Sequence, residues 1–453
     1  MADETLFEMP ESRVAESAAS TRREEARLLQ PCREQMEWAP RSLDAAIGED
    51  HPVRAIWALL ERLDLSAFYT SIKAVLGRPG HPATDPRVLL GLWLYATAEG
   101  VGSARQLARL CEEHDAYRWL LGGVPTNYHT LSDFRVAHQE ALDELLTKVL
   151  ASMMVEGLVT LRHVAQDGMR TRASAGASSF RRKGTLEGCL TEARKQVERL
   201  AEEREHPDPG VSRREQAARE RGAREREARV EEALRRLPAV EAVKERQSKA
   251  LAKAKREKVT EPRVSTTDPD AHVMKMPDGG FRPAFNLEVA SDVDSQVIVG
   301  VGVVTTGSDG GQALPMAEQV QKRTGVNPEA YLVDGGFASR GDITALEQKD
   351  IVVYAPTRLP RTTTSGRTQA DPRPDDTPEV ANWRQRMQTE EAKKVYKERA
   401  ATAECVNAHL RRYDVRQLPV RGTAKVLSVL LLVAIAHNLL RWIALTGALI
   451  EGA

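Results

Sequence analysis

Apolar residues recur at helical spacing from residue 41 to about residue 160. The segment HPATDPRVLLGLWLYATAEG predicts one helix, with Thr84 as its N-terminal cap. The stretch that follows Ser103 predicts two short helices, and a longer amphipathic helix is predicted from Thr130 to Gly157. This part of the chain therefore predicts a compact helical domain. An ordinary helical bundle and a domain that places a helix in a DNA groove fit the pattern equally well.

The hydrophobic period becomes strand-like after residue 161. LRHVAQDGM predicts a strand that ends at Asp167, and GGFRPAFNLEVASD with SQVIVGVGVVTTG predicts a β-hairpin. A helix, a strand AYLV ending at Asp334, a short helix and a strand IVVYAP follow. A polar linker at residues 358–380 then leads to a helix that carries Glu404.

Residues 186–270 predict a charged helical insertion. Between residues 191 and 260 the chain has 15 acidic and 20 basic residues among 70, so its few apolar residues cannot cover a core face. We expect a protruding hairpin of two long helices, broken at EHPDPG and near Pro238. The simplest interpretation is a solvated arm without chemistry of its own, and contact with DNA or a second subunit is the alternative.

Composition narrows the class of protein. The 65 basic and 65 acidic residues balance, so affinity for nucleic acid must come from local patches. The four cysteines form no CxxC pair, which argues against a zinc site or a disulfide framework and fits a reducing compartment. The apolar stretch 426–445 is interrupted by His437, Asn438 and Arg441, which predicts a buried helix and not a membrane span. We expect a cytoplasmic protein without a membrane partner.

Two strands end in aspartate, which raises the question of a metal site. Asp334 precedes two glycines, and such a residue is either a turn former or a ligand at a strand tip. The element order is three strands, helix, strand, helix, strand and then the helix with Glu404, which is the ribonuclease-H-like order. In that order the first and fourth strands are neighbours, so we expect Asp167 and Asp334 to meet.

The chain resembles bacterial insertion-sequence transposases of the DDE class, in the group whose last motif is Tyr-Arg-Glu-Lys. The similarity rests on HVAQDGMRTRAS, YLVDGGF and YKERAATAECVNAHLRR, and on HPATDPRVLLGLWLYATAEG and STTDPDAHVMKMPDGGFRPAFN in the expected places. It implies an α/β ribonuclease-H-like catalytic domain, an N-terminal all-helical domain and the charged helical insertion. The implied domains are a loosely ordered leader (1–40), a helical DNA-binding domain (41–160), a catalytic domain (161–185 and 271–450, with the linker 358–380) and the insertion (186–270).

The resemblance implies metal-dependent DNA strand cleavage and strand transfer. Asp167, Asp334 and Glu404 would be both the catalytic residues and the ligands of two Mg²⁺ ions, with Mn²⁺ able to substitute. The implied partners are double-stranded DNA, as terminal inverted repeats and as target, and a second copy of the chain in a homodimer. Such a bacterial protein would be cytoplasmic and associated with the nucleoid.

Further residues are expected to contact DNA. The last motif implies Tyr396, Arg399 and Arg411 as phosphate contacts, while Arg105 and Arg109 follow Ser103 on a predicted helix that has the length and charge to read bases. Solvated or packed side chains are the alternative for all five residues.

The last motif departs from its usual form in two ways. Four residues separate Arg399 from Glu404 where the family usually has three, so Ala403 takes the expected Glu position. Arg411 stands where the family has lysine, which keeps the positive charge. Two other functions remain open: a host-adopted nuclease with the same chemistry, and a catalytically inactive DNA-binding or scaffold protein.

Overall fold

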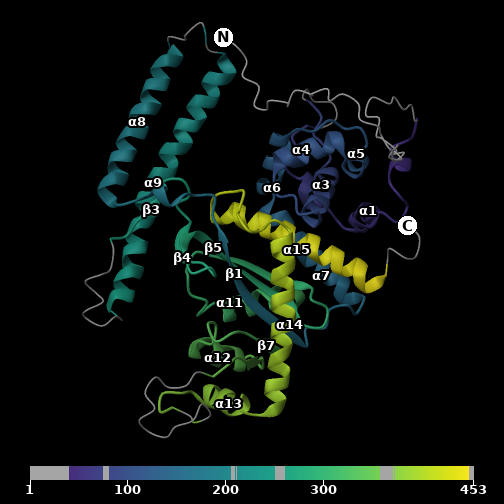
Figure 1. Ribbon diagram of the computed structural model, residues 1–453, viewed down its shortest axis with the longest axis vertical. Helices are drawn as coiled ribbons and strands as arrows, with labels where there is room; N and C mark the ends of the chain where they lie inside the picture. Colours follow the sequence, from purple (N-terminus) through teal and green to yellow (C-terminus); the bar gives the residue numbers. More distant parts are fainter. Residues whose placement is uncertain are drawn as a thin grey trace, which may run out of the picture. The chain divides into compact units, whose positions relative to one another are not determined.

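A mixed β-sheet and the helices around it make up Leu43–Ala453, one of the two units into which the chain divides. The computed structural model describes residues 40–74, 81–205, 210, 212–249, 261–357, 371 and 373–447 (Figure 1). The predicted leader lies outside these residues except for residue 40, as does most of the predicted linker. The three described cysteines, Cys111, Cys189 and Cys405, are free thiols.

The N-terminal region is helical, as predicted. Its elements are η1 (Asp44–Ala46), α1 (Pro52–Arg62), α2 (Ser66–Tyr69), α3 (Pro86–Ala98), α4 (Ala104–Glu113), α5 (Asp115–Leu121), α6 (Tyr128–Ala137) and α7 (Gln139–Val155). The cap of α3 is Asp85 and not the predicted Thr84, because the Asp85 carboxylate accepts a 2.8 Å hydrogen bond from the Arg87 N–H.

The long helix predicted from Thr130 to Gly157 is wrong, because the structure has two helices there. Asn127 caps α6 by accepting hydrogen bonds from the N–H groups of His129 and Thr130. His138 then leaves helical geometry and ends α6, and its ring packs against both Phe68 and Phe134 at centroid distances of 5.5 and 4.8 Å. Tertiary packing of one histidine therefore interrupts a continuous apolar period.

The charged insertion forms a helical hairpin, as predicted (Figure 1). It comprises α8 (Lys183–Glu205) and α9 (Arg213–Lys249), joined at its base to a two-stranded sheet of β2 (Phe180–Arg181) and β3 (Val264–Ser265), with the short η2 (Ala177–Ser179) before β2. The predicted break near Pro238 is wrong. The helix α9 continues through this proline, next to Leu237, which packs with Leu186 and Val264 in a small core at the base.

The main sheet has the strand order β4–β5–β1–β7–β8, with β6 also paired to β5. The strands are β1 (His163–Arg172), β4 (His272–Lys275), β5 (Phe281–Asp292), β6 (Ile298–Val304), β7 (Ala330–Leu332) and β8 (Val352–Tyr354). Strand β1 is antiparallel to β5 and parallel to β7, and β7 is parallel to β8. The predicted adjacency of the first strand and the strand before Asp334 is confirmed.

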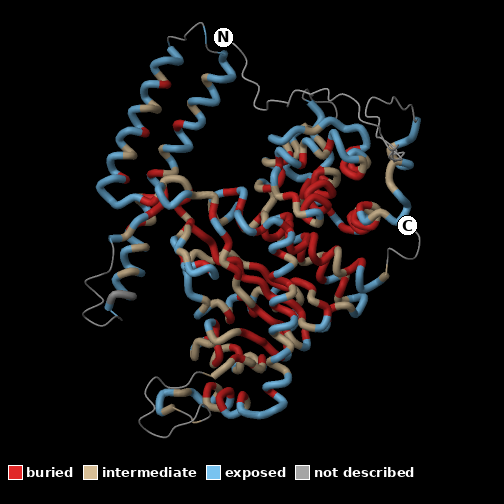
Figure 2. Tube along the Cα trace, in the orientation of Figure 1, coloured by how far each residue is buried: buried red, intermediate tan, exposed pale blue. Residues whose placement is uncertain are grey.

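Helices cover both faces of this sheet. The remaining helices are α11 (Ala313–Thr324), α12 (Arg340–Glu347), α13 (Pro378–Arg386), α14 (Glu390–Arg412) and α15 (Thr423–Thr446). Along β1, Gln166 hydrogen-bonds the Gln312 carbonyl at the start of α11, and the next residue, Asp167, contacts α14. Successive strand residues point to opposite faces, so α11 and α14 lie on opposite sides of the sheet. Figure 2 shows the buried residues concentrated along these strands and α15.

The apolar helix α15 is buried, as predicted, and it ties the sheet to the N-terminal helices. It contacts β6 as well as α1, α3, α6 and α7. Its length and composition would allow it to cross a membrane, but 78% of its most apolar window is buried inside the protein. Asn438 pairs with both backbone groups of Ile298, at 2.8 Å each, and His437 hydrogen-bonds the Gln296 carbonyl at 2.9 Å. His437 and Asn438 therefore have a structural role: they hydrogen-bond backbone groups that are buried between α15 and the sheet.

His437 is expected to make stability pH-dependent. Burial lowers the pKa of His437 to about 4, so the folded protein favours the neutral ring. The neutral ring of His437 contributes fully to stability above the ordinary histidine pKa of about 6.5. As the pH falls towards 4, the unfolded chain gains a proton that the folded protein does not, and the free energy of unfolding decreases by up to about 3 kcal/mol. Urea unfolding at pH 7 and pH 4 should show a smaller loss of stability for His437→Gln than for wild type. Equal losses would contradict the assignment.

Candidate active site

Asp167 lies on β1, and Asp334 follows the last residue of β7, the parallel strand beside it. His163 pairs with Ala330 and Ala165 pairs with Leu332, so the same register continued by two residues brings Asp167 opposite Asp334. Adjacent strands are about 4.8 Å apart, so the two carboxylates share one edge of the sheet. Their charges interact, and both also act on the buried Glu288.

The predicted end of the first strand at Asp167 is wrong. Strand β1 continues to Arg172, because its pairing with β5 runs on to that residue. What ends near Asp167 is the pairing with β7, whose last residue is Leu332. Asp334 does follow the end of its strand, and its carboxylate accepts hydrogen bonds from the N–H groups of Gly336 and Phe337. Asp167 therefore lies just after the point where β1 stops pairing with β7, while β1 stays paired with β5 on its other side.

Helix α14 places two side chains directly on Asp167. One carboxylate oxygen accepts a 3.0 Å hydrogen bond from Arg399, and the other accepts a 2.8 Å hydrogen bond from Asn407. Burial raises the pKa of Asp167, while the positive charge of Arg399 opposes that shift. Tyr396 is half-buried beside these groups, and burial likewise raises the pKa of its hydroxyl. The structure therefore brings Asp167, Asp334, Tyr396 and Arg399 together.

Glu404 lies on the same helix but does not join this group. Its side chain is exposed, and no described residue donates a hydrogen bond to it or forms an ion pair with it. Asn407, three residues later, contacts Asp167, and buried Ala403 lies between the faces of Arg399 and Asn407. Glu404 is therefore on the flank of the helix next to the site.

Several buried polar residues that the sequence did not predict lie behind the two aspartates. Glu288 on β5 is opposite Gly168, and a Cβ at Gly168 would lie 2.9 Å from its carboxylate. Its carboxylate accepts hydrogen bonds from Gln166 at 3.0 Å and Asn286 at 2.7 Å. The glycine after Asp167 thus leaves room for a second carboxylate.

Burial raises the pKa of Glu288 to about 8, and the charges of Asp309, Asp167 and Asp334 add to this shift. Asp309, in the loop before α11, accepts a 2.9 Å hydrogen bond from Asn286. A charged residue within the otherwise apolar strand sequence FNLEVA was the available signal for Glu288. Asp309 had no comparable signal, because GSDGG reads as a simple turn.

The carboxylate oxygens at this edge of the sheet are suitable ligands for a hard divalent cation, but they are not arranged as a complete metal site. Within the described ranges, no three His, Cys, Asp or Glu side chains are placed to hold a metal ion. Carboxylate oxygens are nevertheless the ligands that Mg²⁺ prefers, and the side-chain oxygen of Asn286 is buried without a hydrogen-bond partner. Each oxygen of Asp167 accepts one hydrogen bond, from Arg399 or from Asn407, and a carboxylate oxygen held in this way still has a second lone pair that can bind a metal ion.

A groove rich in arginine begins directly beside Asp167. Its lining includes Gly168, Arg170, Arg172, Asp309, Arg411 and Arg416. Arg172, Arg411 and Arg416 are exposed, whereas Arg170 hydrogen-bonds the carbonyls of Lys275 and Gly307. The structure thus places Arg411 next to the carboxylates, in a groove with the charge that a phosphate backbone requires.

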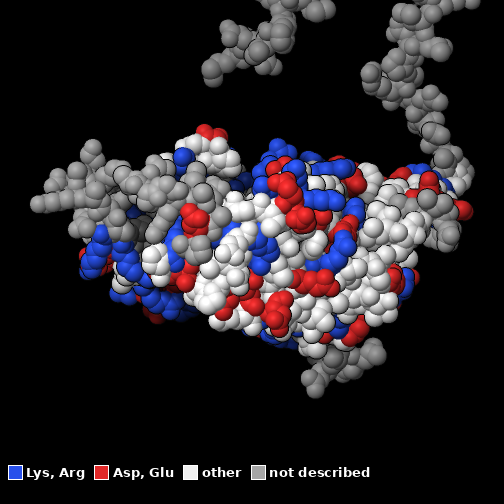
Figure 3. Space-filling view, turned by 90° about the horizontal axis from the view of Figure 1, so that it is seen from below, with Lys and Arg blue, Asp and Glu red and all other residues white. Residues whose placement is uncertain are grey.

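Arg105 and Arg109 lie elsewhere, on α4 of the N-terminal region. They are exposed and one turn apart; Arg105 lies over the Tyr128 ring, and Arg109 is 3.7 Å from Glu113. Their position on a helix surface is compatible with a groove-reading role and equally with a solvated helix. On the face shown in Figure 3, basic and acidic side chains are interspersed.

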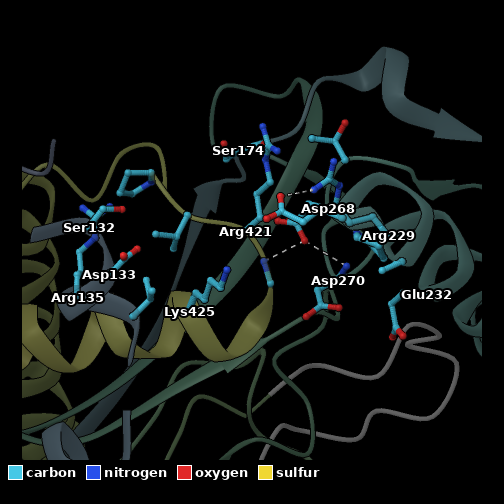
Figure 4. Close-up of a pocket in the computed structure, with 18 residues that line it drawn as sticks. Ser132, Asp133, Arg135, Ser174, Arg229, Glu232, Asp268, Asp270, Arg421 and Lys425 are labelled. Atoms are coloured by element: carbon cyan, nitrogen blue, oxygen red, sulfur yellow. Dashed lines mark hydrogen bonds and ion pairs between the residues drawn. The ribbon is translucent and has the colours of Figure 1, made fainter. Parts of the chain in front are cut away.

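A second hollow lies between α6, α9 and the start of α15 (Figure 4). Asp270 in its wall accepts hydrogen bonds from the N–H and hydroxyl of Thr423 and pairs with Arg236 of α9 at 2.7 Å. Asp268 accepts a hydrogen bond from the Gly422 N–H, and burial raises its pKa. These carboxylates satisfy the first turn of α15, so the STTDPDA segment has a structural role here.

Two comparisons with protein families bear on this site. Residues 41–137 match the family model of a transposase domain (DUF772), and residues 362–443 match that of a transposase DDE domain. The first match holds the helices from α1 to α6, and the second holds α14 with Glu404. No curated protein and no solved structure matches the chain.

Two separate parts of the chain, together less than half of it, are therefore similar to transposase domains. More narrowly, they support its assignment to the insertion-sequence transposases of the DDE class, as the motifs had indicated.

Proposed function

We propose that this chain binds the terminal inverted repeats of its element and catalyses metal-dependent DNA cleavage and strand transfer at the edge of the sheet. The observation that carries this proposal is the register of β1 and β7, because its last pair, Ala165 with Leu332, comes two residues before Asp167 and two residues before Asp334. A pair of carboxylates at a rigid, open edge is what phosphodiester chemistry with divalent metal ions requires.

The strand arrangement supports a ribonuclease-H-like catalytic domain. The order β6–β5–β1–β7–β8 has three antiparallel strands followed by two parallel ones, with β1 at the centre. The helices α11, before β7, and α12, between β7 and β8, also follow that order. This agreement extends beyond the residues matched by the DDE domain, since β1 to β8 all precede residue 362.

Asp167, Asp334 and Glu404 would hold the metal ions. Bound Mg²⁺ would neutralise charge at the attacking and leaving oxygens of the phosphodiester. Arg399 donates to one oxygen of Asp167, which keeps a second lone pair for a metal ion. Glu404 must approach from the flank of α14, one turn from Asn407. That approach corresponds to a local movement of α14 relative to β1.

The arginine groove supports DNA as the substrate. It starts at Gly168, next to Asp167, and its exposed cations have no acidic partner among the described residues at Arg172, Arg411 or Arg416. A duplex seated there would bring its phosphates to the carboxylates without any sequence information being read. Recognition of the terminal repeat would then belong to the helical region at residues 41–160, with Arg105 and Arg109, and a homodimer would pair two ends.

Substitutions should separate these two kinds of DNA contact. Arg411→Ala should weaken binding to a terminal-repeat duplex and to a scrambled duplex equally, and lower the salt-dependence slope by about 1. Arg105→Ala should instead reduce the preference for the terminal repeat, by about 1–3 kcal/mol for a base contact. Competition binding at several salt concentrations measures both effects. The division of roles is reversed if Arg411→Ala changes the preference and Arg105→Ala does not.

The proposed function is tested with the full chain and a duplex from the end of its element. Cleavage at the repeat boundary is expected in Mg²⁺, and none in EDTA, while binding to the duplex should persist in EDTA. A scrambled duplex serves as the substrate control. Binding without cleavage in either Mg²⁺ or Mn²⁺ would sink the enzymatic proposal and favour a DNA-binding or scaffold protein.

A further inference from the structure

Asp309 is close to Asp334, although the two residues come from different loops. An ideal Cβ placed on Gly336 would be 2.9 Å from a carboxylate oxygen of Asp334 and 3.1 Å from one of Asp309. Both carboxylates therefore approach each other beside the Gly336 backbone, where only a glycine leaves room for them. Two carboxylates facing one small gap repel each other unless a cation or proton lies between them.

Asn286, which donates a hydrogen bond to Asp309, supplies an independent indication that this cluster of carboxylates receives a ligand. Its side chain is 1% exposed, and its amide nitrogen donates to Asp309 at 2.9 Å and to Glu288 at 2.7 Å. Its side-chain oxygen has no hydrogen-bond partner, and it lies 3.1 Å from where a Cβ of Gly168 would be. A buried acceptor without a partner is rare and costs free energy, so it points to a cation or water that completes the site.

We propose that Asp309 is a carboxylate ligand of a divalent cation that it shares with Asp334, and that Asn286 is the positioning residue that orients it. The loop before α11 thereby contributes a carboxylate that the DDE motif does not contain. This ligand reaches the cation from the side of the sheet opposite α14, and its position does not depend on a movement of that helix. The inference rests on the proposed function, because it takes the edge beside Asp167 and Asp334 to be a metal site.

A purely structural role for Asp309 explains its hydrogen bond with Asn286 but not its negative charge. Its hydrogen bond from Asn286 would be kept by an asparagine, which also offers a side-chain oxygen. The negative charge itself is therefore unexplained by that contact, and it is unfavourable beside Asp334, Asp167 and Glu288. A bound cation turns the same charge into a favourable contribution.

The test is Mn²⁺ binding by the full chain without DNA, followed by the electron paramagnetic resonance signal of free Mn²⁺. Asp309→Asn should raise the dissociation constant about tenfold or more, on the scale seen when metal-site partners are lost. Asp334→Asn should have at least the same effect. Asp294→Asn, in the exposed turn between β5 and β6, is the matched control and should bind as wild type. Melting in EDTA provides a second readout, in which Asp309→Asn should be as stable as wild type or more stable.

The outcomes separate this inference from the proposed function. If Asp334→Asn loses Mn²⁺ and Asp309→Asn keeps it, the inference is overturned and the metal site stands. If both variants bind Mn²⁺ as wild type, both proposals fall. A variant Asp309→Asn that does not fold, or that melts well below wild type in EDTA, assigns Asp309 a structural role and also overturns the inference.

Discussion

Replacing Asp167 with asparagine should lower the rate of DNA cleavage by at least about a thousandfold, because several kcal/mol of metal-dependent charge stabilisation is lost. An amide is neutral and a poor ligand for a hard cation. The side-chain oxygen of asparagine can still accept a hydrogen bond from Arg399, so the contact between β1 and α14 and the fold should survive. Binding of the terminal-repeat duplex should change little, because Asp167 offers no positive charge to a phosphate.

Single-turnover cleavage and equilibrium binding of the same duplex measure the two effects separately. Asp294→Asn, in an exposed turn, is the control and should cleave at the wild-type rate. An Asp167→Asn variant that loses binding and cleavage to the same degree would show that the residue maintains structure and does not take part in the chemistry. Full cleavage by that variant would remove Asp167 from the active site.

Replacing Asn438 with alanine should lower the free energy of unfolding by about 2–5 kcal/mol. The side chain is fully buried and hydrogen-bonds both the N–H and the carbonyl of Ile298 at the start of β6. Alanine would leave two buried backbone groups without partners, and each such group costs about 1–3 kcal/mol. The junction between α15 and the sheet would be weakened as a result.

Urea unfolding of the full chain measures this loss. Lys425→Ala is the control on the same helix, because Lys425 is exposed and its replacement should change stability by less than about 0.5 kcal/mol. An Asn438→Ala variant as stable as the Lys425→Ala control would mean that water or a rearranged backbone satisfies Ile298.

The sequence contained enough information to place the two aspartates together. The order of strand and helix periods predicted that β1 and β7 are neighbours, and this was independent of any exact boundary. The register of β1 and β7 depends on backbone hydrogen bonds between the two strands. A hydrophobic pattern does not show which residues form those hydrogen bonds. The end of β1 was misplaced for this reason, since its continued pairing with β5 does not show in its own sequence.

Other features depended on contacts between distant residues. The break at His138 comes from packing against Phe68, and the continuity of α9 through Pro238 depends on the small core at its base. The exposed position of Glu404 follows from the rotation of α14, which Arg399 and Asn407 set by contacting Asp167. Local spacing cannot supply that rotation, so the third carboxylate of the motif was the least predictable part of the site.

The position of α15 has a consequence for the order in which the protein is synthesised. Helices α1, α3, α6 and α7 emerge early from the ribosome, but α15, which packs against all four, begins 268 residues after the end of α7. At about 5–20 residues per second, the apolar surface that α15 covers stays open for tens of seconds. Strand β1 likewise waits for β7. A nascent chain therefore lacks the pairing of β1 with β7 until residue 332 has been made, and it lacks a finished helical core until α15 has been made.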